Sequence, residues 1–319
     1  MIKIKTTPNM YGVTLMGDYD DLYELYESLS TYLDFYNDNV EYMPYHEYEY
    51  LLSLDYDIRH CYQGDRGFET VDNSSDRFKN WASDDYGYGM SEETKKKYNK
   101  LYRDHKHGNL YYSVEILYPL IFHYIITLEM ILEDEPGDEW FNKISYADCT
   151  WGDRYSMIDA MKDRAAIAGF VGLLWENVQE LLGREKADSI YRYYQAIEYP
   201  VPSSTYCDVL IHCQMVNFET MTPEEKLDYH LASIYEIMDV EDMEEYPDEF
   251  RVDADLYHKA VSELNSGELK RFPVRTEFYE ELDRIYDPSK PMYEDAFEKF
   301  LEDTYGKNPD PFETGHFEW

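Results

Sequence analysis

The stretch from Tyr155 to Leu182 constrains the fold more than any other part of the sequence, because it has the strongest helical composition. Its centre, AAIAGFVGLLW, is apolar on every side of a helix, and such a helix is stable in water only when other elements surround it. Ala165, Ala168, Gly169 and Gly172 would let one of those elements approach closely. We therefore expect a central buried helix within a mainly helical protein.

The N-terminal part of the sequence has strand composition as well. IKIKT (2–6) alternates apolar and basic residues, and YGVTLMGD (11–18) follows a Pro8-Asn9 turn, which together indicate a hairpin. FETV (68–71) and NLYYSVEILY (109–118) are further strand candidates. The sequence thus predicts an α+β fold, mainly helical, with a small N-terminal antiparallel sheet packed on long buried helices.

Local signals also place several helix ends. Asp18 or Asp20 can cap a helix through DDLYELYESLSTYL, and a second helix is expected from about His46 to Gln63, with Gly64 at its end. Farther along, Thr222, Pro223 and Glu225 form a capping box. Other helices are expected at 253–265, 276–286 and 290–305.

The segment YPVPSS (199–204) is the best candidate for a domain boundary, because it combines two prolines with two serines. We expect an α+β domain over residues 1–199 and a helical C-terminal region over residues 200–319. That region either stands apart or docks on the same core.

The charge of the chain restricts its partners. It holds 67 acids against 29 lysines and arginines, a net charge of −38, and acids outnumber bases in both halves. Such a chain repels nucleic acid and anionic membranes, whereas a basic protein or a cation remains a candidate partner. The start MIKIKTTPNM does not have the composition of a signal peptide, and the apolar run 116–132 is short for a membrane span. We expect a cytoplasmic protein without a membrane partner.

The passage YDIRHCYQGDRG (56–67) gathers cations that are scarce elsewhere, and two interpretations of it remain open. It can be the capped end of a helix, where cations meet the partial negative charge of the last carbonyls. It can instead form the rim of an anion- or peptide-binding pocket. We also expect Arg59 or Arg66 to pair with a carboxylate of the 109–118 strand, Glu115 being the first candidate. The candidate pocket residues are Arg59, His60, Gln63, Asp65, Arg66 and Glu115.

Evidence for catalysis or metal binding is weak in the sequence. RDHKHGN offers Asp104, His105 and His107 as metal-ligand candidates, although an exposed loop explains them better. The four cysteines form no CxxC pair, and the sequence contains no HExxH, EF-hand, GxSxG or glycine-rich phosphate motif. No cofactor is expected.

Three segments resemble a known family in the order in which they occur: TPNMYGVTLMGDYDDLYELYESL, DYDIRHCYQGDR and NLYYSVEILYP. They are similar to the signature segments of an uncharacterised bacterial family catalogued only as a domain of unknown function. The resemblance covers about residues 1–185. It implies an α+β N-terminal unit and brings no activity, cofactor or catalytic residue.

These observations favour a non-enzymatic interaction protein, such as an inhibitor or immunity-like protein for a basic partner. The acidic run 238–255 is one candidate docking strip for that partner, and a solvated linker is its plainer explanation. Two enzymatic alternatives remain: an unfamiliar enzyme with a site at Arg59, His60, Asp65 and Arg66, or a cation-dependent hydrolase.

Overall fold

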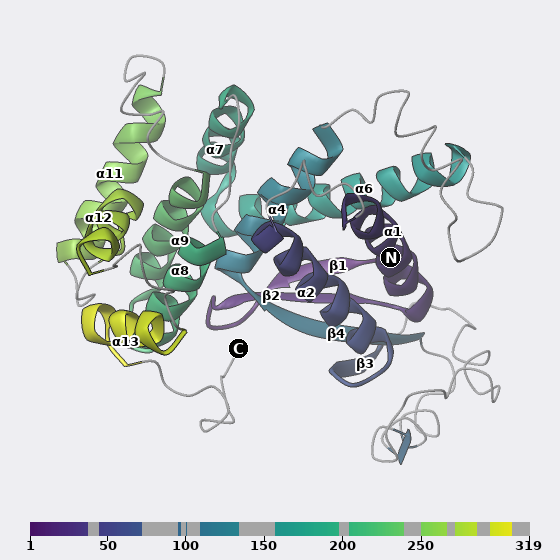
Figure 1. Cartoon of the computed structure of the whole chain (residues 1–319). Coiled ribbons are helices and arrows are strands. Elements are labelled where there is room, and N and C mark those ends of the chain that lie inside the picture. The colour runs from purple at the N-terminus through teal and green to yellow at the C-terminus, as the bar shows by residue number, and fades with distance from the viewer. Residues whose placement is uncertain are drawn as a thin grey trace. The chain divides into compact units, whose positions relative to one another are not determined.

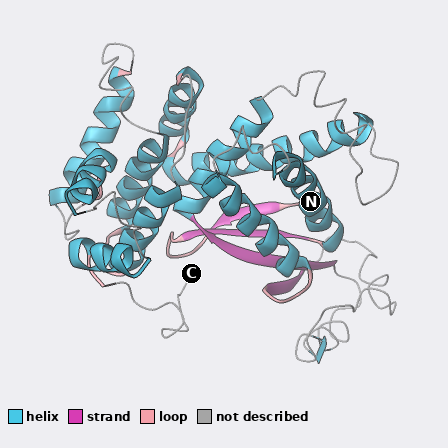
Figure 2. Ribbon diagram, viewed as in Figure 1, coloured by secondary structure: helices cyan, strands magenta, loops and turns pink. Residues whose placement is uncertain are grey.

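The computed structural model of the chain describes residues 1–37, 45–71, 95–96, 100, 109–133, 157–197, 204–238, 250–266, 272–285 and 294–307. Within these residues it has ten long α-helices and four β-strands (Figures 1 and 2). The α+β, mainly helical fold class predicted from the sequence is confirmed.

The four strands form one small antiparallel sheet in the order β1-β2-β4-β3. Strand β3 pairs with β4 in a register that places Gly67 opposite Ser113 and Val71 opposite Asn109. The predicted N-terminal hairpin is present, because the Thr7 amide bonds the Gly12 carbonyl at 2.9 Å. The strands are β1 Lys3–Thr6, β2 Gly12–Gly17, β3 Gly67–Val71 and β4 Asn109–Leu117.

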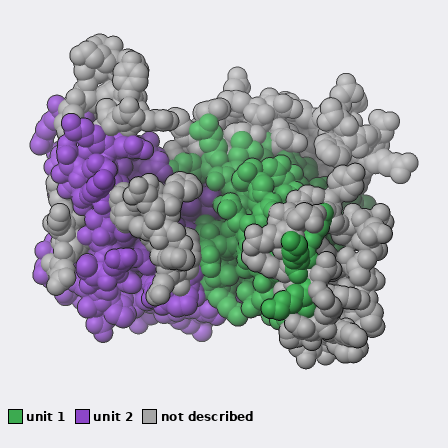
Figure 3. All heavy atoms as spheres, turned by 90° about the horizontal axis from the view of Figure 1, so that it is seen from below, with its two compact units in different colours: residues 1–5, 14–116, 131–174 green, residues 6–13, 117–130, 175–319 purple. Residues whose placement is uncertain are grey.

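The chain divides into two compact units, coloured in Figure 3, and each unit is built from three segments. Unit 1 comprises residues 1–5, 14–116 and 131–174, and unit 2 comprises residues 6–13, 117–130 and 175–319. These divisions differ from the boundary expected at residues 199–200. Because residues 198–203 lie outside the described residues, that boundary stays a prediction.

Unit 1 contains a pair of helices, α1 (Tyr19–Asn37) and α2 (Tyr45–Tyr62). The start of α1 contacts the end of α2 through Tyr19 and Tyr62, whose ring centres are 5.4 Å apart, and Ser30 bonds Asp55 at 2.9 Å. The two helices therefore run antiparallel. Each helix buries an apolar stripe, which consists of Leu22, Leu25, Leu29, Leu33, Leu51, Leu54 and Ile58.

Helix α6 (Met157–Leu182) departs from the expectation of burial on every side. Ile167, Phe170 and Leu174 on one face are buried. On the other face, Ile158 is 66% exposed and Met161 is 63% exposed. The apolar composition of this helix predicted a partner on all sides, but among the described residues this face remains exposed at Ile158 and Met161.

The remaining helices belong mainly to unit 2. Helix α4 is almost wholly buried, as the prediction of long buried helices requires. The capping box at the start of α9 is confirmed, because the Glu225 carboxylate accepts the Thr222 amide at 2.7 Å and the Thr222 hydroxyl accepts the Glu225 amide at 3.2 Å. Helices α7 and α8 were not predicted. The helices are α4 Tyr118–Glu133, α7 Arg184–Ala196, α8 Ser204–Asn217, α9 Pro223–Met238, α11 Arg251–Ser266, α12 Arg275–Ile285 and α13 Glu294–Tyr305.

Candidate functional site

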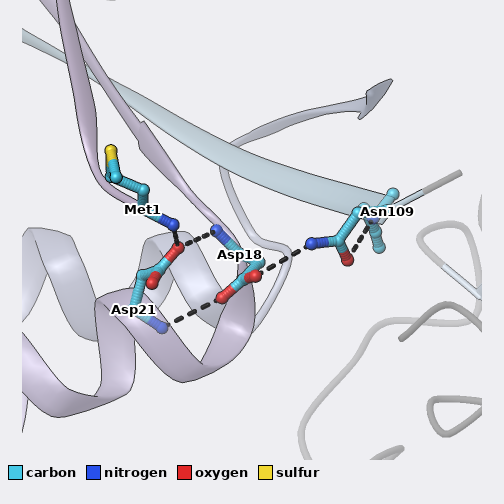
Figure 4. Close-up of polar contacts among 5 residues, drawn as sticks. Met1, Asp18, Asp21 and Asn109 are labelled. Atoms are coloured by element: carbon cyan, nitrogen blue, oxygen red, sulfur yellow. Dashed lines mark hydrogen bonds and ion pairs between the residues drawn. The ribbon is translucent and has the colours of Figure 1, made fainter. Parts of the chain in front are cut away.

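The start of α1 is fixed by a network of carboxylates, shown in Figure 4. The Asp21 backbone amide donates to the Asp18 carboxylate at 3.0 Å, and the Asp18 amide lies 3.4 Å from the Asp21 carboxylate. Asn109 on β4 donates its side-chain amide to Asp18 at 2.8 Å, and the Met1 amine contacts Asp21. Asp18 is therefore the predicted helix cap, and it also ties α1 to the sheet.

The electrostatics of this network follow from its hydrogen bonds. Burial opposes ionisation of Asp18, but the bonds from the Asp21 amide and from Asn109 outweigh it, so the pKa of Asp18 is lowered. Burial raises the pKa of Asp21 despite its contact with the Met1 amine. The negative charge of Asp18 at the first turn interacts favourably with the helix dipole and stabilises the start of α1.

The cluster at the end of α2 is arranged mainly as pairs of neighbouring side chains. Arg66 binds Asp57 at 2.6 Å, and the His60 ring lies 3.1 Å from Asp65. Both pairs are partly exposed, and exposed pairs of this kind contribute at most about 1 kcal/mol. These contacts agree with the interpretation of the passage as a helix end.

The other predicted members of the cluster take no part in these two ion pairs. The Arg59 guanidinium lies 5.0 Å from the centre of the Tyr56 ring, and the Gln63 backbone amide bonds the Arg59 carbonyl at 3.2 Å. Glu115 is exposed on β4. The ion pair expected between Arg59 or Arg66 and Glu115 is not among the contacts of the described residues, and Arg66, in the turn after α2, binds Asp57 instead. That these residues line a binding pocket stays a prediction.

Gly64 ends α2 in the left-handed conformation predicted from the sequence, with φ 81°. Its amide bonds the Cys61 carbonyl at 2.9 Å, and the Asp65 amide bonds the His60 carbonyl at 3.1 Å. Replacing Gly64 by alanine should lower the free energy of unfolding by about 1 kcal/mol, because a Cβ disfavours positive φ. Urea denaturation measures the loss. Gly64→Asn should lose less, since asparagine tolerates this conformation, and equal losses for both variants would contradict the explanation.

Four tyrosines form a cluster where α1 and α2 meet, and we name Tyr19, Tyr23, Tyr26 and Tyr62 the tyrosine face. Tyr19 and Tyr23 stack with ring centres 5.6 Å apart and an interplanar angle of 8°. Tyr62 meets Tyr19, Tyr23 and Tyr26 edge-on, at 5.4, 5.7 and 5.6 Å. Stacked and edge-to-face ring pairs at these distances are favourable contacts, so the four rings hold one another in fixed orientations.

The tyrosine face is open to solvent at Tyr23 and lies beside carboxylates. Tyr62 is 7% exposed whereas Tyr23 is 40% exposed. Burial, and then Glu27, whose carboxylate bonds the hydroxyl, raise the pKa of Tyr23 to about 12, so this ring is neutral at physiological pH. Each of Tyr19, Tyr23 and Tyr26 is followed directly in the sequence by an exposed acidic residue. We name these three residues, Asp20, Glu24 and Glu27, the acidic ridge.

Sequence reasoning missed the tyrosine face, although part of its signal was visible. Tyr19, Tyr23 and Tyr26 recur at the spacing of one helix face. The contribution of Tyr62 depends on how α1 and α2 pair, which sequence spacing does not give.

The remaining chemical candidates are the metal-ligand residues, the acidic run and Cys61. Asp104, His105 and His107 lie outside the described residues, as does most of the acidic run 238–255. In the part of the chain that the structure describes, no group of three or more His, Cys, Asp or Glu residues is placed to hold a metal ion. Burial raises the pKa of the Cys61 thiol far above its usual range, so Cys61 is not a thiolate nucleophile.

Comparisons with known proteins agree with the resemblance seen in the sequence. A family model described as Domain of unknown function (DUF6904) matches residues 2–86, which include the first two signature segments, the tyrosine face and the cluster at the end of α2. Searches of curated proteins and of solved structures find no match. No described helix combines the length and the apolarity that a membrane span requires. The predicted resemblance to an uncharacterised family is thus confirmed over residues 2–86, which match the domain of unknown function DUF6904.

Proposed function

We propose that this chain is a non-enzymatic interaction protein and that it binds a basic protein through the tyrosine face and the acidic ridge. The observation that carries the proposal is the exposed ring of Tyr23 beside the exposed carboxylates Glu24 and Glu27. Ring faces attract Lys and Arg side chains, and the neighbouring carboxylates pair with the same cations. One surface thus offers both kinds of contact that a cationic segment needs.

Rigidity and long-range charge both support this role. The rings are held by one another and by two paired helices, so little conformational entropy is lost when a partner binds. Aromatic residues are enriched in the cores of protein interfaces, whereas charged residues belong to the rim. The net charge of −38 would accelerate the approach of a basic partner and repel acidic ones.

A titration with a defined cationic probe tests the proposal. A fluorescein-labelled peptide of alternating arginine and glycine should bind the full chain with a measurable anisotropy change, more weakly as salt rises. Tyr23→Leu should weaken binding about three- to fivefold, because leucine keeps the apolar volume and removes the ring face. Glu24→Lys with Glu27→Lys should weaken binding by at least about tenfold, since two attractions become repulsions.

A charge-matched control separates this surface from general acidity. Glu302 and Asp303 are exposed on α13, and Glu302→Lys with Asp303→Lys changes the net charge by the same amount. This control should bind the peptide nearly as well as the wild-type chain. Equal losses in the two double variants, or no binding to the wild-type chain, would overturn the proposal.

A further inference from the structure

The ring of Tyr23 is held in one orientation at the surface of unit 1. It is the most exposed ring of the tyrosine face, at 40%. It stacks on Tyr19 with an interplanar angle of 8°, and its centre lies 5.7 Å from that of Tyr62. Its hydroxyl bonds the Glu27 carboxylate one turn farther along α1. Because this flat ring is fixed before a partner binds, it favours a ligand that is itself flat.

The carboxylates beside Tyr23 are not neutralised by cations of the described part of the chain. Glu24 and Glu27 form no ion pair there, and no lysine or arginine of those residues lies over the Tyr23 ring. Glu24 follows Tyr23 directly, and Glu27 is its neighbour four residues on, where side chains of a helix meet. The ring and its carboxylates therefore await a cation from outside these residues.

The contacts between cations and rings within the described residues differ with the exposure of the ring. Lys3 lies over Tyr111, and Lys226 lies over Tyr11 and Phe218, which are three rings at most 5% exposed. The cation over an exposed ring is an arginine. The Arg59 guanidinium lies 5.0 Å from the centre of the Tyr56 ring, which is 50% exposed. Tyr23 resembles Tyr56 in its exposure.

The two cations differ in what an exposed ring offers them. The lysine ammonium is compact and strongly hydrated, so at a ring that is open to water it keeps its hydration shell. The guanidinium is flat and weakly hydrated, and it stacks on an aromatic face with little loss of hydration. Its N–H groups can also bond both oxygens of a carboxylate at once. An exposed ring beside free carboxylates thus suits arginine better than lysine.

We propose that the tyrosine face and the acidic ridge select arginine over lysine, a selectivity that rests on the binding role proposed above. The partner is then a protein that presents an exposed arginine-rich segment. One arginine lies over the Tyr23 ring and directs its N–H groups to the Glu24 or Glu27 carboxylate. A surface that acted through net charge alone would not depend on the ring of Tyr23 for this discrimination.

Two labelled peptides of equal length and charge test the selectivity. One alternates arginine with glycine and the other lysine with glycine, and each is titrated with the full chain by fluorescence anisotropy in the same buffer. The arginine peptide should bind at least about fivefold more tightly. Tyr23→Leu should reduce this preference to about twofold, because the lysine peptide loses little when the ring is removed. Tyr23→Phe keeps the ring and should keep most of the preference.

Tyr56→Leu is the matched control, because the Tyr56 ring is also exposed but already holds Arg59. This variant should retain the wild-type preference. Equal binding of the two peptides to the wild-type chain, or an undiminished preference in Tyr23→Leu, would overturn the selectivity and leave the binding role intact. An equal reduction of the preference in Tyr56→Leu would overturn the assignment to Tyr23. Failure of both peptides to bind the wild-type chain would overturn the binding role itself.

Discussion

Replacing Glu236 by alanine is expected to lower the free energy of unfolding by about 3–5 kcal/mol. Glu236 lies on α9 and is 0% exposed. Its carboxylate accepts a bond from the Tyr257 hydroxyl and another from the Arg275 backbone amide at 3.0 Å. Alanine would take this acceptor away from the buried Tyr257 hydroxyl and from the part-buried Arg275 amide, and it would remove a negative charge beside the first residue of α12.

Neighbouring substitutions separate these contributions. Tyr257→Phe removes one donor and should cost about 1–2 kcal/mol, less than Glu236→Ala. Glu263 is exposed on α11, so Glu263→Ala should change the free energy of unfolding by less than about 0.5 kcal/mol. Urea denaturation followed by tryptophan fluorescence measures all three variants. If Glu236→Ala loses as little stability as Glu263→Ala, the buried carboxylate does not stabilise the contacts of α9 with α11 and α12.

The parts of the fold that local chemistry determines were predictable. Asp18 begins α1 because its side chain caps the amide of Asp21, and Gly64 ends α2 because it adopts positive φ. The capping box of Thr222 and Glu225 depends on residues three apart. In each case the partner groups lie within one helical turn, so sequence spacing is sufficient to identify them.

The errors arose where a distant partner decides the outcome. The apolar centre of α6 was expected to be covered on all sides, but composition does not reveal how many neighbours reach a helix. Arg59 or Arg66 was expected to pair with Glu115 on β4, whereas Arg66, in the turn after α2, binds Asp57 on that helix. The tyrosine face and the bonds of Glu236 join residues that are dozens of positions apart, and they follow from helix pairing rather than from spacing.

Acidification from pH 6.5 to 4.5 is expected to cost the folded chain roughly 2.5 kcal/mol for each of two buried histidines. Burial lowers the pKa of His230 to about 3 and that of His123 to about 4, against 6.5 for an ordinary histidine. As the pH falls below 6.5, both histidines therefore bind protons in the unfolded chain but stay neutral in the folded chain. The stability that these two neutral rings contribute is complete above pH 6.5 and declines as the pH falls toward their folded pKa values.

The surroundings of His230 in unit 2 explain why its ring stays neutral in the folded chain. Its Nε2 donates to the Met10 carbonyl at 2.8 Å, and its ring packs against Tyr118 and Phe218 at 4.4 and 5.2 Å between ring centres. Lys226 on the same helix adds repulsion against a second positive charge. The bond to Met10 alone would favour protonation, but desolvation of the ring outweighs it.

The slope of stability against pH isolates this effect from any loss of packing. Between pH 6 and 5, His230→Gln should reduce the slope of the unfolding free energy by about one proton, or roughly 1.4 kcal/mol per pH unit, whatever it costs at neutral pH. Urea titrations at three pH values give the slopes of the wild-type chain and of His230→Gln. An unaltered slope in His230→Gln would mean that this imidazole is protonated within the folded chain, and the bond to the Met10 carbonyl would then have to hold a buried cation.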